Sequence, residues 1–277
     1  MDVHATDREV DITSAQVVAD SIRTLRPDAV VHLAAQSSVA ASWKDPLSAY
    51  RLNYLGSLNL LRALEAQAPE ARVLLIGSSD CYGSDADHTG RPISEADPLR
   101  PESPYARTKA AAEQLGALAA ERGLSVVRVR AFTHIGAGQT DAFVASSFAR
   151  QVAEIAAGLR EPRMRVGNLD SVRDFLDVRD VIEAYVRLLD PAVPVGTYNV
   201  ASGKGVPIRA LLDQLFDLAG VDADIEVDPE RYRPTDYRIG DSTKLREASG
   251  WAPRIELRET LSGILESWRH QVAPADA

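Results

Sequence analysis

Apolar positions change their spacing several times along this chain, and each change marks a predicted element. From Val18 to Leu25 they recur three or four residues apart, which predicts a helix over residues 13–26. Pro27 ends that helix, and the unbroken apolar run at residues 29–33 predicts a buried strand. The start of the chain therefore has the alternation of helix and strand that is typical of α/β proteins.

The same alternation continues through the rest of the chain. We expect strands at residues 73–76, 125–130, 163–166 and 197–200, a loop at residues 167–174, and helices at residues 45–66, 104–122, 143–157, 178–189, 208–219 and 257–269. Strands that alternate with helices usually form parallel sheets. The sequence therefore predicts an α/β fold, with a Rossmann-type parallel sheet and a smaller C-terminal substrate lobe.

The order of elements becomes more mixed after about residue 143. We expect residues 1–140 plus 176–202 to form a dinucleotide-binding domain, and residues 141–175 plus 203–277 to form a substrate-binding lobe. No low-complexity segment, repeat or long linker separates these parts. We therefore expect them to share an interface, with the binding cleft between them.

Composition narrows the class of protein further. Apolar residues make up 45% of the 277 residues, which is enough for a packed core. The net charge of -9 argues against general nucleic-acid binding, which needs a basic face. Cys81 is the single cysteine, so no internal disulfide can form and a reducing compartment is favoured. The polar N-terminus and the lack of any apolar run near ~18 residues predict a cytoplasmic protein without a membrane span.

Tyr105 and Lys109 carry the strongest local chemical signal. Residues four apart lie on one face of a helix, so the phenol and the ammonium are expected to be neighbours. A nearby positive charge lowers the pKa of a tyrosine, which suits a general acid that gives up its proton near neutral pH. The spacing alone is common, and a half-buried tyrosine beside a solvated lysine is the alternative interpretation.

Hydroxyl side chains follow the predicted strand at residues 73–76. Ser78 and Asp80 come just past its carboxyl end, where open α/β sheets bind their ligands. Ser78 could therefore stabilise an oxyanion that Tyr105 protonates. A serine-rich turn capped by Asp80 explains the same residues without any chemistry, and both interpretations stay open at this point.

Several segments together resemble the extended short-chain dehydrogenase/reductase family in order and spacing. They are His32–Gln36, Gly77–Gly83, Ser103–Lys109, Arg173–Phe175 and Tyr198–Gly203. Within that family the resemblance is closest to the GDP-4-keto-6-deoxy-mannose reductases, through His134–Gln139, Val166–Asp170 and Arg233–Asp236. The resemblance covers nearly the whole chain. It implies an oxidoreductase that uses NADH or NADPH to reduce a nucleotide-linked 4-keto-6-deoxy sugar.

The resemblance also assigns roles to single residues. Tyr105 would be the general acid, Lys109 would hold the nicotinamide ribose, and Ser78 would take the family's Ser/Thr position. The residues that would line the cofactor groove are Asp11, Ile12, Leu33, Ala34, Ala35, Gln36, Ser37, Tyr105, Lys109 and His134. The residues that would contact the substrate are Ser78, Asp80, Thr133, Arg173 and Arg233. The two arginines would bind the diphosphate, because a guanidinium fork fits that anion. Thr133 stands where the family usually has asparagine.

The start of the chain departs from the family pattern. Such proteins open with a strand, a glycine-rich turn and a helix that meets the cofactor pyrophosphate, whereas no glycine occurs here before Gly56. We therefore expect a sheet without the family's first strand, first helix and second strand. An N-terminally truncated form is our hypothesis. Mass spectrometry of the natural protein tests it, because a native N-terminus at Met1 would contradict a misplaced start.

Three other functions fit parts of the same pattern. A GDP-mannose 4,6-dehydratase must also remove a proton from C5, and related dehydratases place a glutamate where Asp80 stands. The shorter side chain favours the reductase, because a base must reach within ~3 Å of its proton. A nucleotide-sugar 4-epimerase fits the set of Ser78, Tyr105 and Lys109 equally well. A truncated, non-catalytic nucleotide-binding module fits the missing glycine-rich turn, although the intact catalytic set argues against it.

The remaining candidates have plainer interpretations. His32 is expected to pack at the end of its strand, and Cys81 is expected to be a small buried residue beside the site. Trp251 is expected to anchor the C-terminal lobe. The five histidines show no metal-ligand spacing, so we expect no metal. By resemblance alone we expect a homodimer, formed through the helices at residues 46–66 and 104–122.

Overall fold

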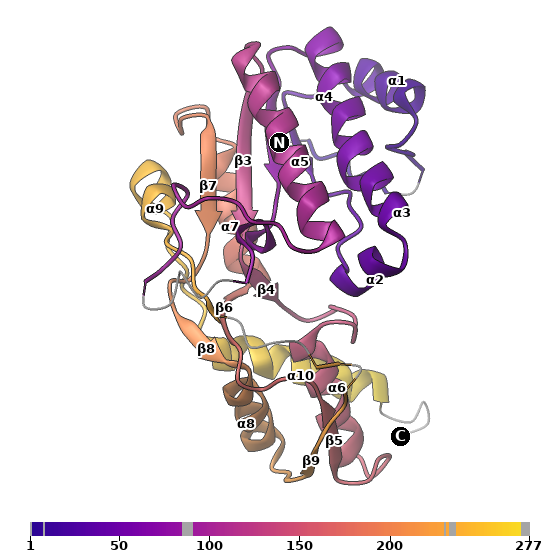
Figure 1. Ribbon diagram of the computed structural model, residues 1–277, viewed down its shortest axis with the longest axis vertical. Coiled ribbons are helices and arrows are strands. Elements are labelled where there is room, and N and C mark those ends of the chain that lie inside the picture. Colours follow the sequence, from indigo (N-terminus) through magenta and orange to yellow (C-terminus); the bar gives the residue numbers. More distant parts are fainter. Residues whose placement is uncertain (1, 8, 85–90, 230, 233–236, 273–277) are drawn as a thin grey trace.

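The computed structural model describes residues 2–7, 9–84, 91–229, 231–232 and 237–272. Figure 1 shows an upper region, which is built around a parallel sheet, and a lower region in which helices predominate. The chain passes between the two regions more than once, so segments far apart in the sequence meet where they join. The expected division into two domains at the stated residues stays a prediction.

The upper region contains a four-stranded parallel sheet in the order β1-β2-β3-β7. These strands are β1 (Ala29–His32), β2 (Arg72–Ile76), β3 (Ser125–Ala131) and β7 (Gly196–Val200). Each lies where the apolar runs predicted a strand, and the Rossmann-type parallel sheet is confirmed. β1 forms one edge of the sheet. No strand in the described part of the chain pairs with its outer side.

Helices cover both faces of this sheet, as Figure 1 shows. One face is covered by α1 (Ala15–Leu25), α4 (Gly56–Gln67) and α5 (Pro104–Glu121), and the other by α7 (Val178–Leu188) and α9 (Thr243–Ser249). On the first face Val73 and Leu75 of β2 are buried against Leu64 of α4. On the second face Leu74 packs with the fully buried Trp251. Because successive residues of β2 face opposite ways, both of its faces are apolar and its sequence reads as an unbroken run.

Residues 46–67 form one helical run that contains a π-helical turn. Asp45 caps α3 (Pro46–Tyr50), and its carboxylate accepts a hydrogen bond from the Ser48 N–H at 3.0 Å. The π turn Arg51–Leu55 follows and leads into α4. It was not predicted, and it turns the buried Asn53 side chain towards the loop after β1. Such π turns are often found at functional sites.

The lower region begins where β3 leaves the parallel sheet. After Phe132 the chain continues as β4 (Thr133–Ile135), which pairs in parallel with β6 (Val172–Asp177). β10 (Tyr237–Arg238) and β8 (Gly205–Pro207) complete this second sheet, while β5 (Arg163–Val166) pairs with β9 (Asp224–Val227). The helices α6 (Val144–Ala156), α8 (Ile208–Ala219) and α10 (Leu257–Val272) enclose a separate apolar core.

Two predictions about this part of the chain need correction. Residues 167–174 are not all loop, because β6 begins at Val172. Arg173 and Asp174 are polar, so the hydropathy pattern did not indicate a strand here. Trp251 does anchor a core, but it packs under the parallel sheet with Leu74 and Tyr198, and its indole N–H donates to the Asp180 carbonyl oxygen at 2.9 Å. It therefore stabilises the upper region and not the C-terminal lobe.

Candidate functional site

Ser78, Tyr105 and Lys109 meet at the carboxyl edge of the parallel sheet. Ser78 follows β2 and caps a short 3₁₀ turn, η2 (Ser79–Tyr82). Tyr105 and Lys109 lie on the first two turns of α5, which Ser103 caps. The Ser78 hydroxyl is close enough to the Tyr105 phenol to lower its pKa, and all three side chains are buried. A carbonyl oxygen placed between the two would meet a hydroxyl from each residue.

The electrostatics of Tyr105 differ from the prediction. Burial raises the pKa of Tyr105 above its ordinary value, and the nearby Asp80 charge adds to the increase. The Ser78 hydrogen bond lowers the same pKa but does not outweigh burial. The Lys109 ammonium donates to the Ile76 carbonyl oxygen at 2.8 Å, at the end of β2. The expected lowering of the Tyr105 pKa by Lys109 is therefore wrong, because loss of solvent dominates.

Lys109 and His32 are both buried at the floor of this site. Burial lowers the pKa of Lys109 to about 8, so the side chain is still mostly protonated at neutral pH. Burial, and then the Lys109 charge, lower the pKa of His32 to about 4. The His32 ring is therefore neutral, with Nε2 3.1 Å from the Ser57 hydroxyl. His32 packs at the end of its strand, as expected.

Asp80 is held from two sides. Its backbone N–H donates to the Ser78 hydroxyl oxygen at 3.2 Å. Its carboxylate accepts a hydrogen bond from the Arg238 guanidinium, which lies on β10 in the second sheet. The sequence analysis missed Arg238, because the two partners are 158 residues apart and nothing local connects them. Asp80 thus joins the turn that carries Ser78 to the lower region.

The loop after β1 lies open beside these residues. The Leu33 side chain is 64% exposed, which is unusual for a leucine at the end of a sheet strand. Gln36 is fixed by Asn53, whose Oδ1 accepts from the Gln36 N–H at 2.8 Å and whose Nδ2 donates to the Thr108 hydroxyl at 2.9 Å. The Gln36 Oε1 atom is buried and has no hydrogen-bond partner within the described residues. An exposed apolar side chain and an unsatisfied amide oxygen fit a groove that receives a ligand.

Two predicted cofactor residues lie near the N-terminal end of the described chain. The Ile12 carbonyl oxygen accepts from Asn59 Nδ2 at 3.0 Å, and a side chain at Gly56 would collide with Ile12. The Asp11 carboxylate is exposed and accepts from the Thr13 N–H and hydroxyl. The segment is therefore fastened against α4, near the edge strand β1.

The other predicted residues belong to the second sheet or lie outside the described residues. Thr133 and His134 are half-buried on β4, and the His134 Nδ1 atom is 3.1 Å from the Phe132 carbonyl oxygen. Arg173 is half-buried on β6, directly beside Arg238 on β10. Arg233 lies outside the described residues. The structure thus brings Arg173 to the same sheet as Thr133 and His134, at the junction with the parallel sheet.

A buried ion pair links the elements that carry the site residues. Glu113 lies one turn after Lys109 on α5, and its carboxylate accepts from Arg130 of β3 at 2.6 to 3.2 Å. Arg130 also donates to the Tyr82 hydroxyl at 2.8 Å, and its guanidinium lies over the Tyr82 ring. The network therefore connects α5, β3 and the η2 turn that carries Asp80. Neither the pair nor its burial was predicted.

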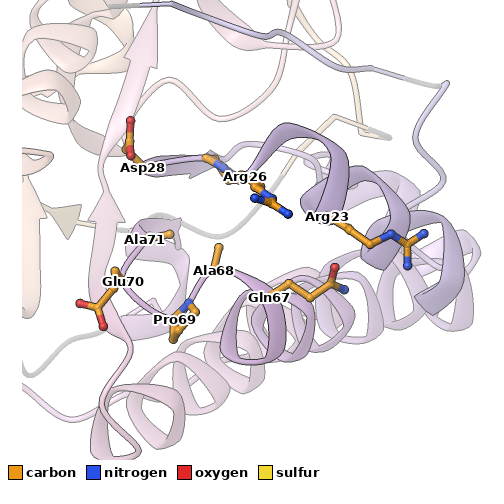
Figure 2. Close-up of a pocket in the computed structure, with 9 residues that line it drawn as sticks. Arg23, Arg26, Asp28, Gln67, Ala68, Pro69, Glu70 and Ala71 are labelled. Carbon is orange, nitrogen blue, oxygen red and sulfur yellow. The ribbon is translucent and has the colours of Figure 1, made fainter.

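Two surface pockets lie away from the catalytic set. Figure 2 shows the larger one, of about 540 Å³, lined by Arg26, Asp28, Gln67 and Glu70 among others. It lies where β1 and β2 begin, and open α/β sheets bind ligands at the opposite, carboxyl ends. A smaller one of about 220 Å³ in the lower region is rich in arginine. Its lining residues are Asp141, Ser147, Arg150, Gln151, Arg160, Arg165 and Arg231.

The described ranges hold no group of three or more His, Cys, Asp or Glu side chains arranged to bind a metal ion. No helix within the same ranges is both long and apolar enough to cross a membrane.

Comparison with known proteins gives consistent matches over most of the chain. A family model described as GDP-mannose 4,6 dehydratase matches residues 3–264. The GDP-6-deoxy-D-mannose reductase of Pseudomonas aeruginosa is 42% identical over 249 residues, which cover 89% of this chain and 82% of that protein.

Solved structures support the same relationship. The structure of RMD from Pseudomonas aeruginosa complexed with NADPH has a TM-score of 0.90 and 39% identity, covering 98% of this chain and 90% of that one. The UDP-glucose 4-epimerase of Thermus thermophilus in complex with NAD has a TM-score of 0.84 and 30% identity, covering 95% of this chain and 84% of that one. The fold is thus shared with proteins whose structures contain dinucleotides.

Proposed function

We propose that this chain, which belongs to the GDP-mannose 4,6 dehydratase family of extended short-chain dehydrogenases, is a reductase of a nucleotide-linked 4-keto-6-deoxy sugar. The reaction would be of the kind that converts GDP-4-keto-6-deoxy-mannose to GDP-rhamnose. NADH or NADPH would be the hydride donor. The observation that carries the proposal is the buried set of Ser78, at the end of β2, and Tyr105 and Lys109, which lie one turn apart on α5. The 42% identity to a GDP-6-deoxy-D-mannose reductase supports this choice of reaction.

The cofactor-binding part of the proposal rests on the groove beside β1. Leu33, Ala34, Ala35, Gln36 and Ser37 would line it, together with Asp11, Ile12 and His134. The exposed Leu33 and the unsatisfied Gln36 oxygen fit a bound nicotinamide cofactor. The chain has no glycine-rich turn before Gly56, so the fit concerns the nicotinamide end and not the pyrophosphate. When bound, such a cofactor supplies the hydride for C4.

The residues of the chain would handle the oxygen and its proton. The Tyr105 phenol would donate its proton to the ketone oxygen, a role worth roughly 10²–10⁴ in rate. The Ser78 hydroxyl would donate a hydrogen bond to the same oxygen and stabilise its developing charge. The high pKa of Tyr105 keeps the phenol protonated and ready to donate. The buried Lys109 ammonium places positive charge on the floor of the site.

The sugar nucleotide would lie across the junction of the two regions. Asp80 and Thr133 would border the sugar, and Arg173 would meet the diphosphate, as would Arg233 outside the described residues. The arginine-rich pocket of the lower region offers further cationic groups for an anionic nucleotide. Its four arginines pair with three carboxylates, those of Asp141, Glu154 and Asp228, which therefore balance only part of the positive charge.

We also propose that the chain forms a homodimer. Trp43, Leu47 and Leu118 are 62%, 75% and 51% exposed on α2 (Val39–Lys44), α3 and α5. Large apolar side chains that gather on neighbouring helices suit a protein interface. Light scattering of the purified chain and of the variant Leu47→Lys tests this. A monomeric wild type would contradict the proposal.

The decisive experiment mixes the purified chain with GDP-4-keto-6-deoxy-mannose and NADPH or NADH, and follows cofactor absorbance and products. A reductase consumes reduced cofactor in proportion to the ketone. A dehydratase instead converts GDP-mannose without net consumption, and an epimerase inverts C4 without net redox change. Binding of NAD(P)H without turnover of any of these sugars would favour a non-catalytic module. Tyr105→Phe serves as the inactive control.

A further inference from the structure

The pairing of Asp80 with Arg238 links the catalytic hydroxyls to the second sheet. The Arg238 guanidinium donates to the Asp80 carboxylate, and the Asp80 backbone N–H donates to the Ser78 hydroxyl oxygen at 3.2 Å. Ser78 is in turn the neighbour of the Tyr105 phenol whose hydroxyl lowers the pKa of Tyr105. The side chains of Arg238 and Asp80 are only 10% and 25% exposed, so solvent screens their attraction weakly. Four residues therefore form one continuous chain of contacts across the junction.

Arg238 is a fixed anchor and not a mobile surface charge. It lies on β10 and pairs with Arg173 of β6. The next two residues are also fastened, because the Ile239 carbonyl oxygen accepts from the Ile93 N–H at 2.7 Å and the Gly240 N–H donates to Asp174 at 3.2 Å. The backbone of β10 is therefore fixed, and the Arg238 guanidinium reaches from it to the Asp80 carboxylate. The η2 turn is also held at Tyr82, by Arg130 and Asn199, but Asp80 is the residue of this turn that is not buried, and Arg238 is the side chain that pairs with its carboxylate.

The charge of Asp80 bears directly on Tyr105. After burial, that charge is the largest cause that raises the pKa of Tyr105. An arginine beside Asp80 opposes this effect, since it offsets the negative charge. Without Arg238 the carboxylate would be partly buried near the phenol and uncompensated, which is a costly arrangement for both groups.

We propose that Arg238 is a positioning residue for the reduction: it draws the Asp80 carboxylate towards β10, holds the η2 turn, and leaves Ser78 and Tyr105 as the groups that face the ketone oxygen. This inference rests on the reductase function proposed above. It also accounts for the type of reaction. A carboxylate bound to an arginine is not available to remove the C5 proton, which 4,6-dehydration requires.

A set of matched variants tests the proposal. Arg238→Gln should lower kcat about tenfold or more and leave KM within about threefold, because a positioning defect acts on the chemical step. Asp80→Asn breaks the same pairing from the other side, so adding Arg238→Gln to it should lower kcat by less than about threefold beyond the Asp80→Asn value. Arg238→Lys keeps a cation on β10 and should retain more activity than Arg238→Gln. Arg187→Gln, which loses an ion pair to Glu183 on α7, is the control and should match wild type.

Several results would overturn the inference. If Arg238→Gln raises KM with kcat unchanged, the arginine contacts the substrate and does not act through Asp80. If Arg238→Gln lowers kcat as much in the Asp80→Asn background as in wild type, or if Arg238→Lys loses as much kcat as Arg238→Gln, the pairing is not the cause. Thermal unfolding of each variant identifies any that fail to fold. In that event the comparison of Arg238→Lys with and without Asp80→Asn decides the same question.

Cys81 provides a second measurement that does not depend on turnover. It directly follows Asp80, it is buried, and it is the single thiol of the chain. If Arg238 holds the η2 turn, Arg238→Gln should raise the rate of Cys81 labelling by a thiol reagent about fivefold or more, through local opening. An unchanged rate would overturn the positioning role. A wild-type chain that reduces no 4-keto sugar would contradict the proposed function instead, whatever the labelling rates show.

Discussion

Removing one partner of the buried Glu113–Arg130 pair should destabilise the chain far more than removing both. The two side chains are 7% and 8% exposed, and Arg130 donates to the Glu113 carboxylate at 2.6 to 3.2 Å. In Glu113→Leu the guanidinium keeps only the Tyr82 hydroxyl at 2.8 Å and the Glu95 carbonyl oxygen at 3.2 Å. Breaking such a pair from one side costs about 3–5 kcal/mol, because a charge is left buried without a counter-charge.

The double variant Glu113→Leu/Arg130→Met removes that penalty. Two apolar side chains of similar size replace the ion pair, and the Tyr82 hydroxyl still donates to Asn199 Oδ1 at 2.7 Å. The hydrogen bond lost from Arg130 to Tyr82 costs about 1 kcal/mol. We therefore expect the free energy of unfolding of the double variant to lie within about 2 kcal/mol of the wild-type value. The effects of the two substitutions would then be strongly non-additive.

Equilibrium unfolding in urea, followed by circular dichroism, measures these differences. Arg122→Met is the matched control, since its ion pair with Glu65 leaves Arg122 61% exposed and should contribute below about 1 kcal/mol. The reasoning would be refuted if each single variant lost less than about 1 kcal/mol, or if the losses in the double variant simply added. Either result would mean that Arg130 finds solvent or another partner once Glu113 is gone.

Three further predictions concern single residues. Tyr105→Phe should lower kcat by roughly 10²–10⁴; urea unfolding should change by only about 1 kcal/mol, since the phenol loses one hydrogen bond, to Ser78. His32→Asn should make the stability of the fold less sensitive to acid. The pKa of His32 is 6.5 in the unfolded chain and about 4 in the folded one, so the wild-type free energy of unfolding falls by up to about 3 kcal/mol as the pH drops through that window. Urea midpoints at pH 4 and pH 7 measure the difference, and an unchanged pH dependence in the variant would contradict it. Gly77→Ala should lower the thermal unfolding temperature, because its Cβ would lie 2.5 Å from the Val129 carbonyl oxygen.

The parallel sheet could be predicted because of how its strands are buried. β2 is covered by helices on both faces, so every residue after Arg72 is apolar and the run is visible without any alignment. β6 is equally ordered but carries Arg173, Asp174 and Asp177. Asp174 is buried because the backbone N–H groups of Ser202 and Gly203 donate to it at 2.8 and 2.9 Å. A hydropathy pattern cannot show that compensation, and the strand was taken for a loop.

The candidate site was also only partly predictable from the sequence. Ser78, Tyr105 and Lys109 were found because they lie at fixed distances from a strand end and a helix cap. Arg238 could not be found in this way, since its partner is 158 residues away and no spacing rule connects them. The direction of the Tyr105 pKa shift was wrong for a related reason. Sequence spacing gives the neighbour of a charge but not the depth of burial, and burial is the larger cause here.

The open side of β1 has a consequence for handling the protein in the laboratory. β1 is a short edge strand, and its residues from Ala29 to Val31 are exposed or half-exposed. The N–H and C=O groups on its outer side are a template on which a strand of another molecule can add. Concentrated samples of this chain should therefore be prone to slow edge-to-edge polymerisation, distinct from any dimer formed by its helices. A lysine at the exposed Ala29 would place a charge on that edge and should keep the chain in solution at higher concentration.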